Sequence, residues 1–167
     1  MIYYVTGGER SGKSSYAQKL AEELSSNPYY LATSRIWDDD FKTRVNRHVS
    51  DRDERWTTLE EEKNLSAVIP KNKVVVIDCV TLWLTNFYVD NNYNVAKCLE
   101  LVKVELEKLT KLETTLIIIS NEIGMGVHAE TQIGRKFTEL QGWVNQEIAK
   151  LSNKATFMVS GIPMTLK

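Results

Sequence analysis

Cysteine, histidine and proline are all scarce in this sequence, which has two cysteines, two histidines and three prolines among 167 residues. The two cysteines, Cys79 and Cys98, do not have the spacing of a metal-binding set, and so few cysteines do not indicate a disulfide framework. We therefore predict that both are thiols packed in the hydrophobic core.

Long apolar runs and an excess of one charge are also missing. No apolar run approaches the roughly 20 residues that span a bilayer, and no basic-then-apolar leader stands at the start. The 21 basic and 22 acidic side chains give a net charge of −1, which argues against nucleic acid as the main partner. We expect a cytoplasmic protein without a membrane span.

The chain also lacks a linker rich in proline, glycine or serine, an internal repeat and a low-complexity tract, so we expect one domain over residues 1–167. Short β-rich runs alternate with stretches of helical periodicity, the rhythm of a parallel sheet covered on both faces. The predicted strands cover residues 2–6, 29–33, 73–78, 115–120 and 156–160. The third and fourth runs are continuously apolar, as expected for central strands, so function belongs at their carboxyl ends.

The first run leads into a phosphate-binding pattern, Gly-x-x-x-x-Gly-Lys-Ser, which occupies residues 7–14 and precedes a helical stretch at 14–24. Glycines let backbone N–H groups turn around phosphate oxygens at a helix N-terminus, where the helix dipole favours anions. Lys13 would reach the β- and γ-phosphates, and Ser14 would ligate Mg²⁺. The alternative is a plain glycine-rich turn. We predict an α/β P-loop NTPase fold of RecA-like type, three layers around a mostly parallel sheet.

The third predicted strand ends in Asp78, after four branched apolar residues. An acidic residue in this place is typical of the Walker B position of P-loop proteins, which helps to hold Mg²⁺. The alternative is that Asp78 only caps a helix beginning near Thr81.

The fourth predicted strand runs into Asn121 and Glu122 and then into a loop with Gly124 and Gly126. These two polar residues could contact an acceptor substrate or orient water at the ligand-binding edge of the sheet. An ordinary turn would use the same residue types.

Residues 38–48 begin acidic and end basic, an order that suits a helix dipole. On such a helix Arg44 and His48 share one face, and Arg47, Arg52 and Arg55 add positive charge around the imidazole. The alternative is a solvated helix end with a histidine that compensates the dipole.

Nucleotidyl transfer that conserves phosphoanhydride energy needs a nucleophile to carry the nucleotide between two half-reactions, and a neutral imidazole nitrogen can do this. Nearby arginines would stabilise the pentacoordinate phosphate and keep the imidazole neutral. His48 is our candidate, and His128 in the glycine-containing loop is the competing histidine.

Taken together, these motifs resemble the bifunctional adenosylcobinamide kinase/adenosylcobinamide-phosphate guanylyltransferase family of cobalamin biosynthesis. The resemblance spans essentially the whole chain. It is carried by residues 6–14, Ala32-Thr33-Ser34, Arg44-Val45-x-x-His48, Trp56 with Glu60-Glu61, Asp78-Cys79-x-Thr81-Leu82-Trp83-Leu84-x-Asn86, Asn121-Glu122-x-Gly124-Met125-Gly126, Asn145-Gln146, and Ser160-Gly161-Ile162-Pro163.

The resemblance implies two reactions at one P-loop site. ATP or GTP phosphorylates a hydroxyl of adenosylcobinamide, and GTP then guanylylates a histidine, from which the phosphorylated cobinamide takes GMP to give adenosylcobinamide-GDP. By position, His48 would be the guanylylated residue, with Lys13 as a second catalytic residue and Mg²⁺ held by Ser14 and Asp78.

The resemblance also implies the nucleotide contacts and homo-oligomers, commonly trimers. The implied contacts are Gly7, Gly8, Glu9, Arg10, Ser11, Gly12, Lys13, Ser14, Ala32, Thr33, Ser34, Val49, Ser50, Asp51, Arg52, Glu60 and Asp78.

Two other functions stay open on the sequence alone. A plain small-molecule kinase would use the P-loop, Mg²⁺ and Asp78 without a covalent intermediate. A nucleotide-dependent switch would hydrolyse slowly and signal by ordering its loops.

Overall fold

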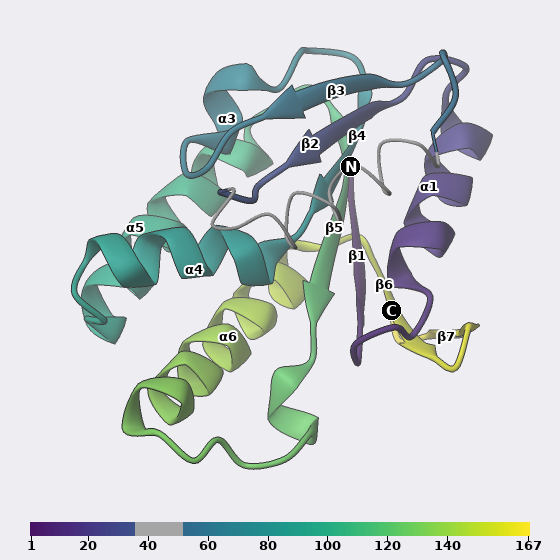
Figure 1. The fold of residues 1–167 in the computed structure, drawn as a ribbon. Helices are drawn as coiled ribbons and strands as arrows, with labels where there is room; N and C mark the ends of the chain where they lie inside the picture. Colours follow the sequence, from purple (N-terminus) through teal and green to yellow (C-terminus); the bar gives the residue numbers. More distant parts are fainter. Residues whose placement is uncertain (36–51) are drawn as a thin grey trace.

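The computed structural model describes residues 1–35 and 52–167. Its strands form one sheet with the order β3-β2-β4-β5-β1-β6-β7 (Figure 1). All neighbouring strands run parallel except β6 and β7, which are antiparallel. The strands are β1 (Ile2–Gly7), β2 (Tyr29–Ala32), β3 (Thr57–Glu60), β4 (Val74–Asp78), β5 (Thr115–Asn121), β6 (Lys154–Val159) and β7 (Ile162–Thr165).

The helices divide unequally between the two faces of this sheet (Figure 1). On one face, α1 packs against the central strands through Ala17 and Ala21. The other face carries the larger core, which includes residues of the remaining α-helices. The helices are α1 (Lys13–Leu24), α3 (Leu65–Val68), α4 (Val80–Asp90), α5 (Val95–Thr110) and α6 (Gln132–Leu151), with a 3-10 turn, η1 (Ile123–Met125).

The apolar run of β4 explains why it is central. Val74 and Val76 belong to the core under α1, whereas Val75 and Ile77 belong to the core on the opposite face. Because alternate side chains of a strand point to opposite faces, a strand covered on both sides must be apolar throughout. The prediction of a mostly parallel sheet with helices on both faces is confirmed.

The RecA-like strand arrangement is also confirmed, since β5 lies between β1, which leads into the phosphate-binding turn, and β4, which ends in Asp78. Both cysteines are free and buried, as predicted. Burial, reinforced by Asp78, raises the pKa of the Cys79 thiol to about 12, so the thiol is neutral at physiological pH. Among the helices of the described chain, none is both long enough and apolar enough to span a membrane.

Candidate active site

The predicted phosphate-binding turn connects β1 to α1. Gly12 precedes the helix with φ of 93°, a left-handed conformation that costs a residue with a side chain about 1 kcal/mol or more. No side chain caps the N-terminus of α1, so its first N–H groups are available to an anion. The turn is closed by a hydrogen bond from the Ser11 amide to the Gly8 carbonyl at 3.3 Å.

Lys13 lies within this turn and is only 7% exposed. Its ammonium donates to the Gly8 carbonyl at 2.5 Å and to Ser11 Oγ at 3.4 Å. Burial lowers the pKa of Lys13, and the nearby Cys79, Asp78 and Glu9 oppose that shift. The lysine is thus held by neutral acceptors of the turn, which phosphate oxygens can replace.

Asp78 receives two hydrogen bonds on the same oxygen. Its Oδ2 accepts from Ser14 Oγ at 2.9 Å and from the hydroxyl of Tyr30 at 2.8 Å. Burial, followed by the charge of Asp78, raises the pKa of Tyr30, so the phenol stays protonated and donates. The N-cap of α4 is Cys79 and no side chain caps it, so Asp78 does not cap this helix.

A serine hydroxyl and a carboxylate that meet beside a phosphate-binding turn fit Mg²⁺, which takes few protein ligands and completes its shell with phosphates and water. No group of three or more His, Cys, Asp or Glu side chains that could hold a metal is present in the part of the chain that the structure describes. The two oxygen ligands of Ser14 and Asp78 suit a Mg²⁺ ion that nucleotide phosphates also bind.

These groups line a cavity of about 1140 Å³ at the carboxyl edge of the sheet. Most of the predicted nucleotide contacts lie on its wall. They are Gly8, Glu9, Arg10, Ser11, Gly12, Lys13, Ser14, Ala32, Ser34, Arg52, Glu60 and Asp78.

The remaining predicted site residues lie elsewhere. His48, Val49, Ser50 and Asp51 fall outside the described residues. Gly7 and Thr33 are not among the residues that line the cavity. Gly7 precedes the turn at the end of β1.

Thr33 is fully buried and joins the ends of two strands. Its hydroxyl donates to the Cys79 carbonyl at 2.8 Å and accepts from the Cys79 amide at 2.9 Å. The amide of Asn86 in α4 donates to the carbonyls of Thr33 at 2.8 Å and Glu62 at 3.0 Å. Thr33 therefore supports the backbone behind the cavity.

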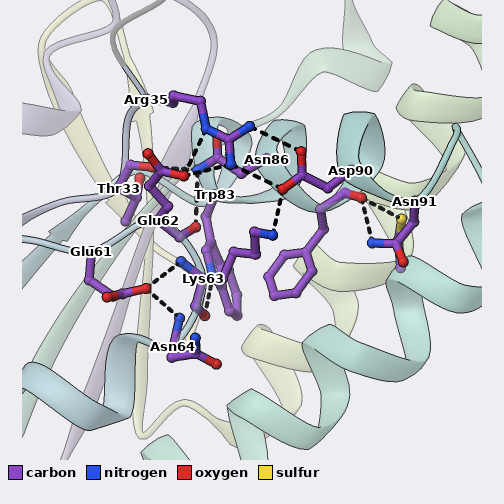
Figure 2. A network of polar contacts seen from close by, with 12 residues as sticks. Thr33, Arg35, Glu61, Glu62, Lys63, Asn64, Trp83, Asn86, Asp90 and Asn91 are labelled. Carbon is purple, nitrogen blue, oxygen red and sulfur yellow. Dashed lines mark hydrogen bonds and ion pairs between the residues drawn. The ribbon is translucent and has the colours of Figure 1, made fainter.

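An ion-pair network continues from Thr33 to the surface (Figure 2). Arg35 pairs with Glu62 at 2.6 Å and with Asp90 at 3.0 Å, and Lys63 also pairs with Asp90. Hydrogen bonds from Arg35 hold the pKa of Asp90 well below its usual range, with Lys63 adding to the effect. The network fixes Arg35, which is the last described residue before the segment that contains His48.

Two aromatic side chains lie beside the site: Tyr30, which no sequence motif identified, and Trp56, which is among the residues that carry the family resemblance. The guanidinium carbon of Arg52 lies 3.7 Å from the centre of the Tyr30 ring, and Trp56 packs edge-on against the same ring at 6.4 Å. Arg52 Nη1 is buried without a hydrogen-bond partner among residues 1–35 and 52–167. Tyr30 therefore contacts both Asp78 and Arg52, and Arg52 follows the segment that contains His48.

Of the other candidate site residues, some line the cavity and some lie on the surface. Asn121 and Glu122 line the cavity, as their predicted position at the carboxyl edge of the sheet requires. His128, the competing histidine, is exposed and is not among the lining residues. Arg55 pairs with Asp53 at 2.7 Å on the surface.

Comparison with known proteins covers nearly the whole chain. The chain is 34% identical to the bifunctional adenosylcobalamin biosynthesis protein CobU of Escherichia coli, with 100% of both proteins covered. It is 36% identical to the bifunctional adenosylcobalamin biosynthesis protein CobP of Pseudomonas aeruginosa, over 98% of this chain and 95% of that protein. A solved structure, the flagellar accessory protein FlaH from Methanocaldococcus jannaschii, aligns with a TM-score of 0.48 at 12% identity, over 99% of this chain and 77% of that one.

The family described as "Cobinamide kinase / cobinamide phosphate guanyltransferase" (CobU) matches residues 3–166. This chain therefore belongs to the cobinamide kinase / cobinamide phosphate guanyltransferase family.

Proposed function

We propose that this protein phosphorylates adenosylcobinamide with ATP or GTP and then transfers GMP from GTP to adenosylcobinamide phosphate through a guanylylated His48. The observation that carries the proposal is the convergence of Lys13, Ser14 and Asp78 on one cavity in a chain of this family. At about 1140 Å³, that cavity has room for more than a triphosphate.

In the kinase reaction, the backbone of the turn and Lys13 bind the β- and γ-phosphates. Ser14 and Asp78 would hold Mg²⁺, which supplies charge neutralisation for the phosphate oxygens. Tyr30 orients the carboxylate of Asp78 through its 2.8 Å hydrogen bond. The acceptor oxygen attacks the γ-phosphorus, the bond to the β-phosphate oxygen breaks, and the nucleoside diphosphate leaves.

In the transfer reaction, an imidazole nitrogen of His48 attacks the α-phosphorus of GTP and pyrophosphate leaves. A phosphate oxygen of the acceptor then attacks the same phosphorus, and the bond to His48 breaks. Arg52, whose Nη1 lacks a partner within the described residues, is a candidate for stabilising the phosphate charge in both steps.

We also propose that the protein is cytoplasmic and forms a homo-oligomer, with a trimer as the candidate assembly. Several large apolar side chains are exposed and available for association, among them Trp143 at 44%, Ile162 at 65% and Leu166 at 61%. Analytical ultracentrifugation of the purified protein tests the association, and a monomer at all concentrations would contradict it.

The covalent intermediate is tested with GTP labelled at the α-phosphate. Wild-type protein should retain an acid-labile label and release pyrophosphate. His48→Ala should lose the label and the transfer reaction while keeping nucleotide binding and kinase turnover. Lys13→Ala should lose both reactions, because the lysine contacts the phosphates in each.

His128→Ala is the matched histidine control, because this exposed residue is outside the cavity lining. It should retain label and turnover. Label that persists in His48→Ala would overturn the role of His48. Kinase turnover without any label in the wild type would leave the alternative, a P-loop small-molecule kinase without a covalent intermediate.

A further inference from the structure

Two polar residues line the cavity at the carboxyl end of β5, which lies between β1 and β4: Asn121, the last residue of the strand, and Glu122, the residue after it. The strand pairs with β1 in a register that places Asn121 beside Gly7, and with β4 in a register that places Ile119 beside Asp78. β5 thus continues beyond Asp78. The backbone N–H of Glu122 donates to the Gly7 carbonyl at 3.0 Å, which fixes Glu122 against the start of the phosphate-binding turn.

Behind these residues lies a buried polar cluster on α6. Gln141 and Asn145 are 0% and 5% exposed, and Ser120 of β5 is also fully buried. Ser120 Oγ donates to Asn145 Oδ1 at 2.6 Å, and Gln141 Nε2 donates to Ser120 Oγ at 2.9 Å and to Asn145 Oδ1 at 3.0 Å. These contacts fix the orientation of the Asn145 amide.

The fixed amide of Asn145 points its donor at the cavity wall. Its Nδ2 donates to the carbonyl of Asn121 at 3.1 Å and to Glu122 Oε2 at 3.4 Å. Asn121 Nδ2 in turn donates to Thr81 Oγ1 at 3.0 Å. The cluster therefore holds the backbone of Asn121 and the carboxylate of Glu122, whereas Thr81 holds the side chain of Asn121.

Burying such a polar cluster costs desolvation free energy, which apolar side chains in the same places would not. A buried amide is tolerated only when its hydrogen bonds are made, and Gln141 Oε1 has no partner among the described residues. Stability alone would favour apolar side chains at Gln141 and Asn145. A role in orienting a group that acts in the cavity would explain why polar side chains occupy these two positions.

Four carboxylates line the cavity, those of Glu9, Glu60, Asp78 and Glu122, and Glu9 is an exposed residue of the phosphate-binding turn itself. Of the other three, Glu122 is the best placed for proton transfer. Asp78 already accepts from Ser14 and Tyr30. Glu60 is exposed on β3, four strands from β1 in the sheet, or about 19 Å at the usual strand spacing. Glu122 follows β5, the strand next to β1, and faces the same cavity as Lys13.

We propose that Glu122 is the general base of the kinase step and that Asn145 is its positioning residue, an inference that rests on the proposed function. As the acceptor oxygen bonds to the γ-phosphorus, its proton passes to the Glu122 carboxylate and the nucleoside diphosphate leaves. The transfer step has no such proton, because the attacking oxygen belongs to an ionised phosphate. Glu122 therefore serves the first reaction and not the second.

The test compares the two reactions in the full-length protein. Glu122→Gln should lower kcat for phosphorylation of adenosylcobinamide by about 10²–10⁴-fold, the usual contribution of a general base, with KM for both substrates within about threefold of wild type. Asn145→Ala should lower the same kcat by about tenfold. Both variants should retain guanylylation of His48 and GMP transfer to adenosylcobinamide phosphate supplied directly.

Two conservative controls accompany these variants. Glu130→Gln changes an exposed carboxylate on the loop after β5, and Gln146→Ala changes the exposed neighbour of Asn145 on α6. Both should keep wild-type kcat. Melting temperatures verify that each variant is folded.

Kinase turnover of Glu122→Gln within threefold of wild type would overturn the inference, as would an equal loss of the kinase and transfer reactions. A wild type without labelled His48 contradicts the proposed transfer mechanism instead. The two failures are distinguishable, because the role of Glu122 is measured on the kinase reaction alone.

Discussion

Gly7 is the residue at which the phosphate-binding turn leaves least space for a side chain. A Cβ at this position would lie 2.5 Å from the Met158 carbonyl oxygen and 2.8 Å from Ser11 Oγ. Because the first of these atoms is backbone of the neighbouring β6, it cannot move aside cheaply. Gly7→Ala should lower the free energy of unfolding by about 1–3 kcal/mol, measured by urea denaturation.

Gly142→Ala is the control for that substitution. Gly142 lies inside α6, and a Cβ there would meet nothing within 4 Å. Alanine in a helix interior should raise the free energy of unfolding by about 0.5–1 kcal/mol. The same loss of stability in both variants would contradict the steric explanation for Gly7.

Tyr30 holds the carboxylate of Asp78 through a single hydroxyl, which donates to the same oxygen as Ser14 Oγ. Tyr30→Phe keeps the ring under Arg52 and removes only that hydrogen bond. Groups that orient metal ligands usually contribute 10–100-fold to metal affinity. The Mg²⁺ concentration for half-maximal kinase activity should therefore rise by about tenfold.

Tyr29→Phe, the adjacent residue of β2, gives the matched comparison. Its ring lies 5.9 Å from the ammonium of Lys73, away from Asp78. Its magnesium dependence should match that of the wild type. An unchanged magnesium dependence in Tyr30→Phe would show that Ser14 alone suffices to orient Asp78.

Residues of the site differed in how far the sequence could identify them. The phosphate-binding turn and Asp78 were found because their spacing and position after a strand are local patterns. Tyr30 and Asn145 act through contacts 48 and 24 residues away along the chain, with Asp78 and the Asn121 carbonyl. A contact of that kind depends on strand order and leaves no periodic signal.

At the scale of elements, the five predicted strands are all present. The two additional strands, β3 and β7, were not predicted. Each has four residues, and both lie at the edges of the sheet. β7 includes Pro163, which is tolerated only where an amide is not required by a neighbour. Short edge strands are stabilised by the strand beside them rather than by their own sequence, so the pattern of apolar residues does not reveal them.

The N-cap of α5, unlike these edge strands, depends on a contact between residues close together in the sequence. The side chain of Asn94 caps this helix by accepting a hydrogen bond from the Lys97 amide at 3.0 Å. A cap of this kind spans three residues and is encoded locally, so it can be identified from the sequence.

The ion-pair network of Figure 2 joins three elements and makes stability depend on pH. Arg35 follows β2, Lys63 precedes α3, and Asp90 ends α4. Since folding lowers the pKa of Asp90, its contribution is present above the ordinary aspartate value of about 3.9 and is lost as the pH falls through the lower folded value.

Asp90→Asn should therefore reduce the free energy of unfolding by about 1 kcal/mol at pH 7, as expected for ion pairs near the surface. The difference from wild type should shrink as the pH falls below about 4. Urea denaturation at pH 7 and pH 3 measures both values. Glu100→Gln, which removes an exposed pair with Lys97, serves as the control and should show little change at either pH. A constant difference for Asp90→Asn at both pH values would contradict the electrostatic origin.

At the scale of the whole molecule, cavity-lining residues from four strands lie together at one edge of the sheet. The cavity is lined by the turn after β1, by Ala32 of β2, by Asp78 of β4 and by Asn121 of β5. This follows from the parallel arrangement, because the carboxyl ends of parallel strands meet at one edge. The location of the cavity at the carboxyl edge of the sheet could be predicted from the sequence. The depth of the cavity and the support of its wall by α6 required the three-dimensional structure.

A ligand that contacts several strands at once stabilises the folded state without binding the unfolded chain. GTP with Mg²⁺ at about 100 times its dissociation constant should add about 2.7 kcal/mol, or about 5–10 °C in melting temperature for a chain of this length. Thermal denaturation should show this shift for the wild type and for Lys19→Ala, which alters an exposed lysine of α1. Lys13→Ala should lose most of the shift at the same GTP concentration, because its ammonium is buried within the turn, where it would contact the phosphates. An equal shift in Lys13→Ala would mean that GTP binds away from this edge of the sheet.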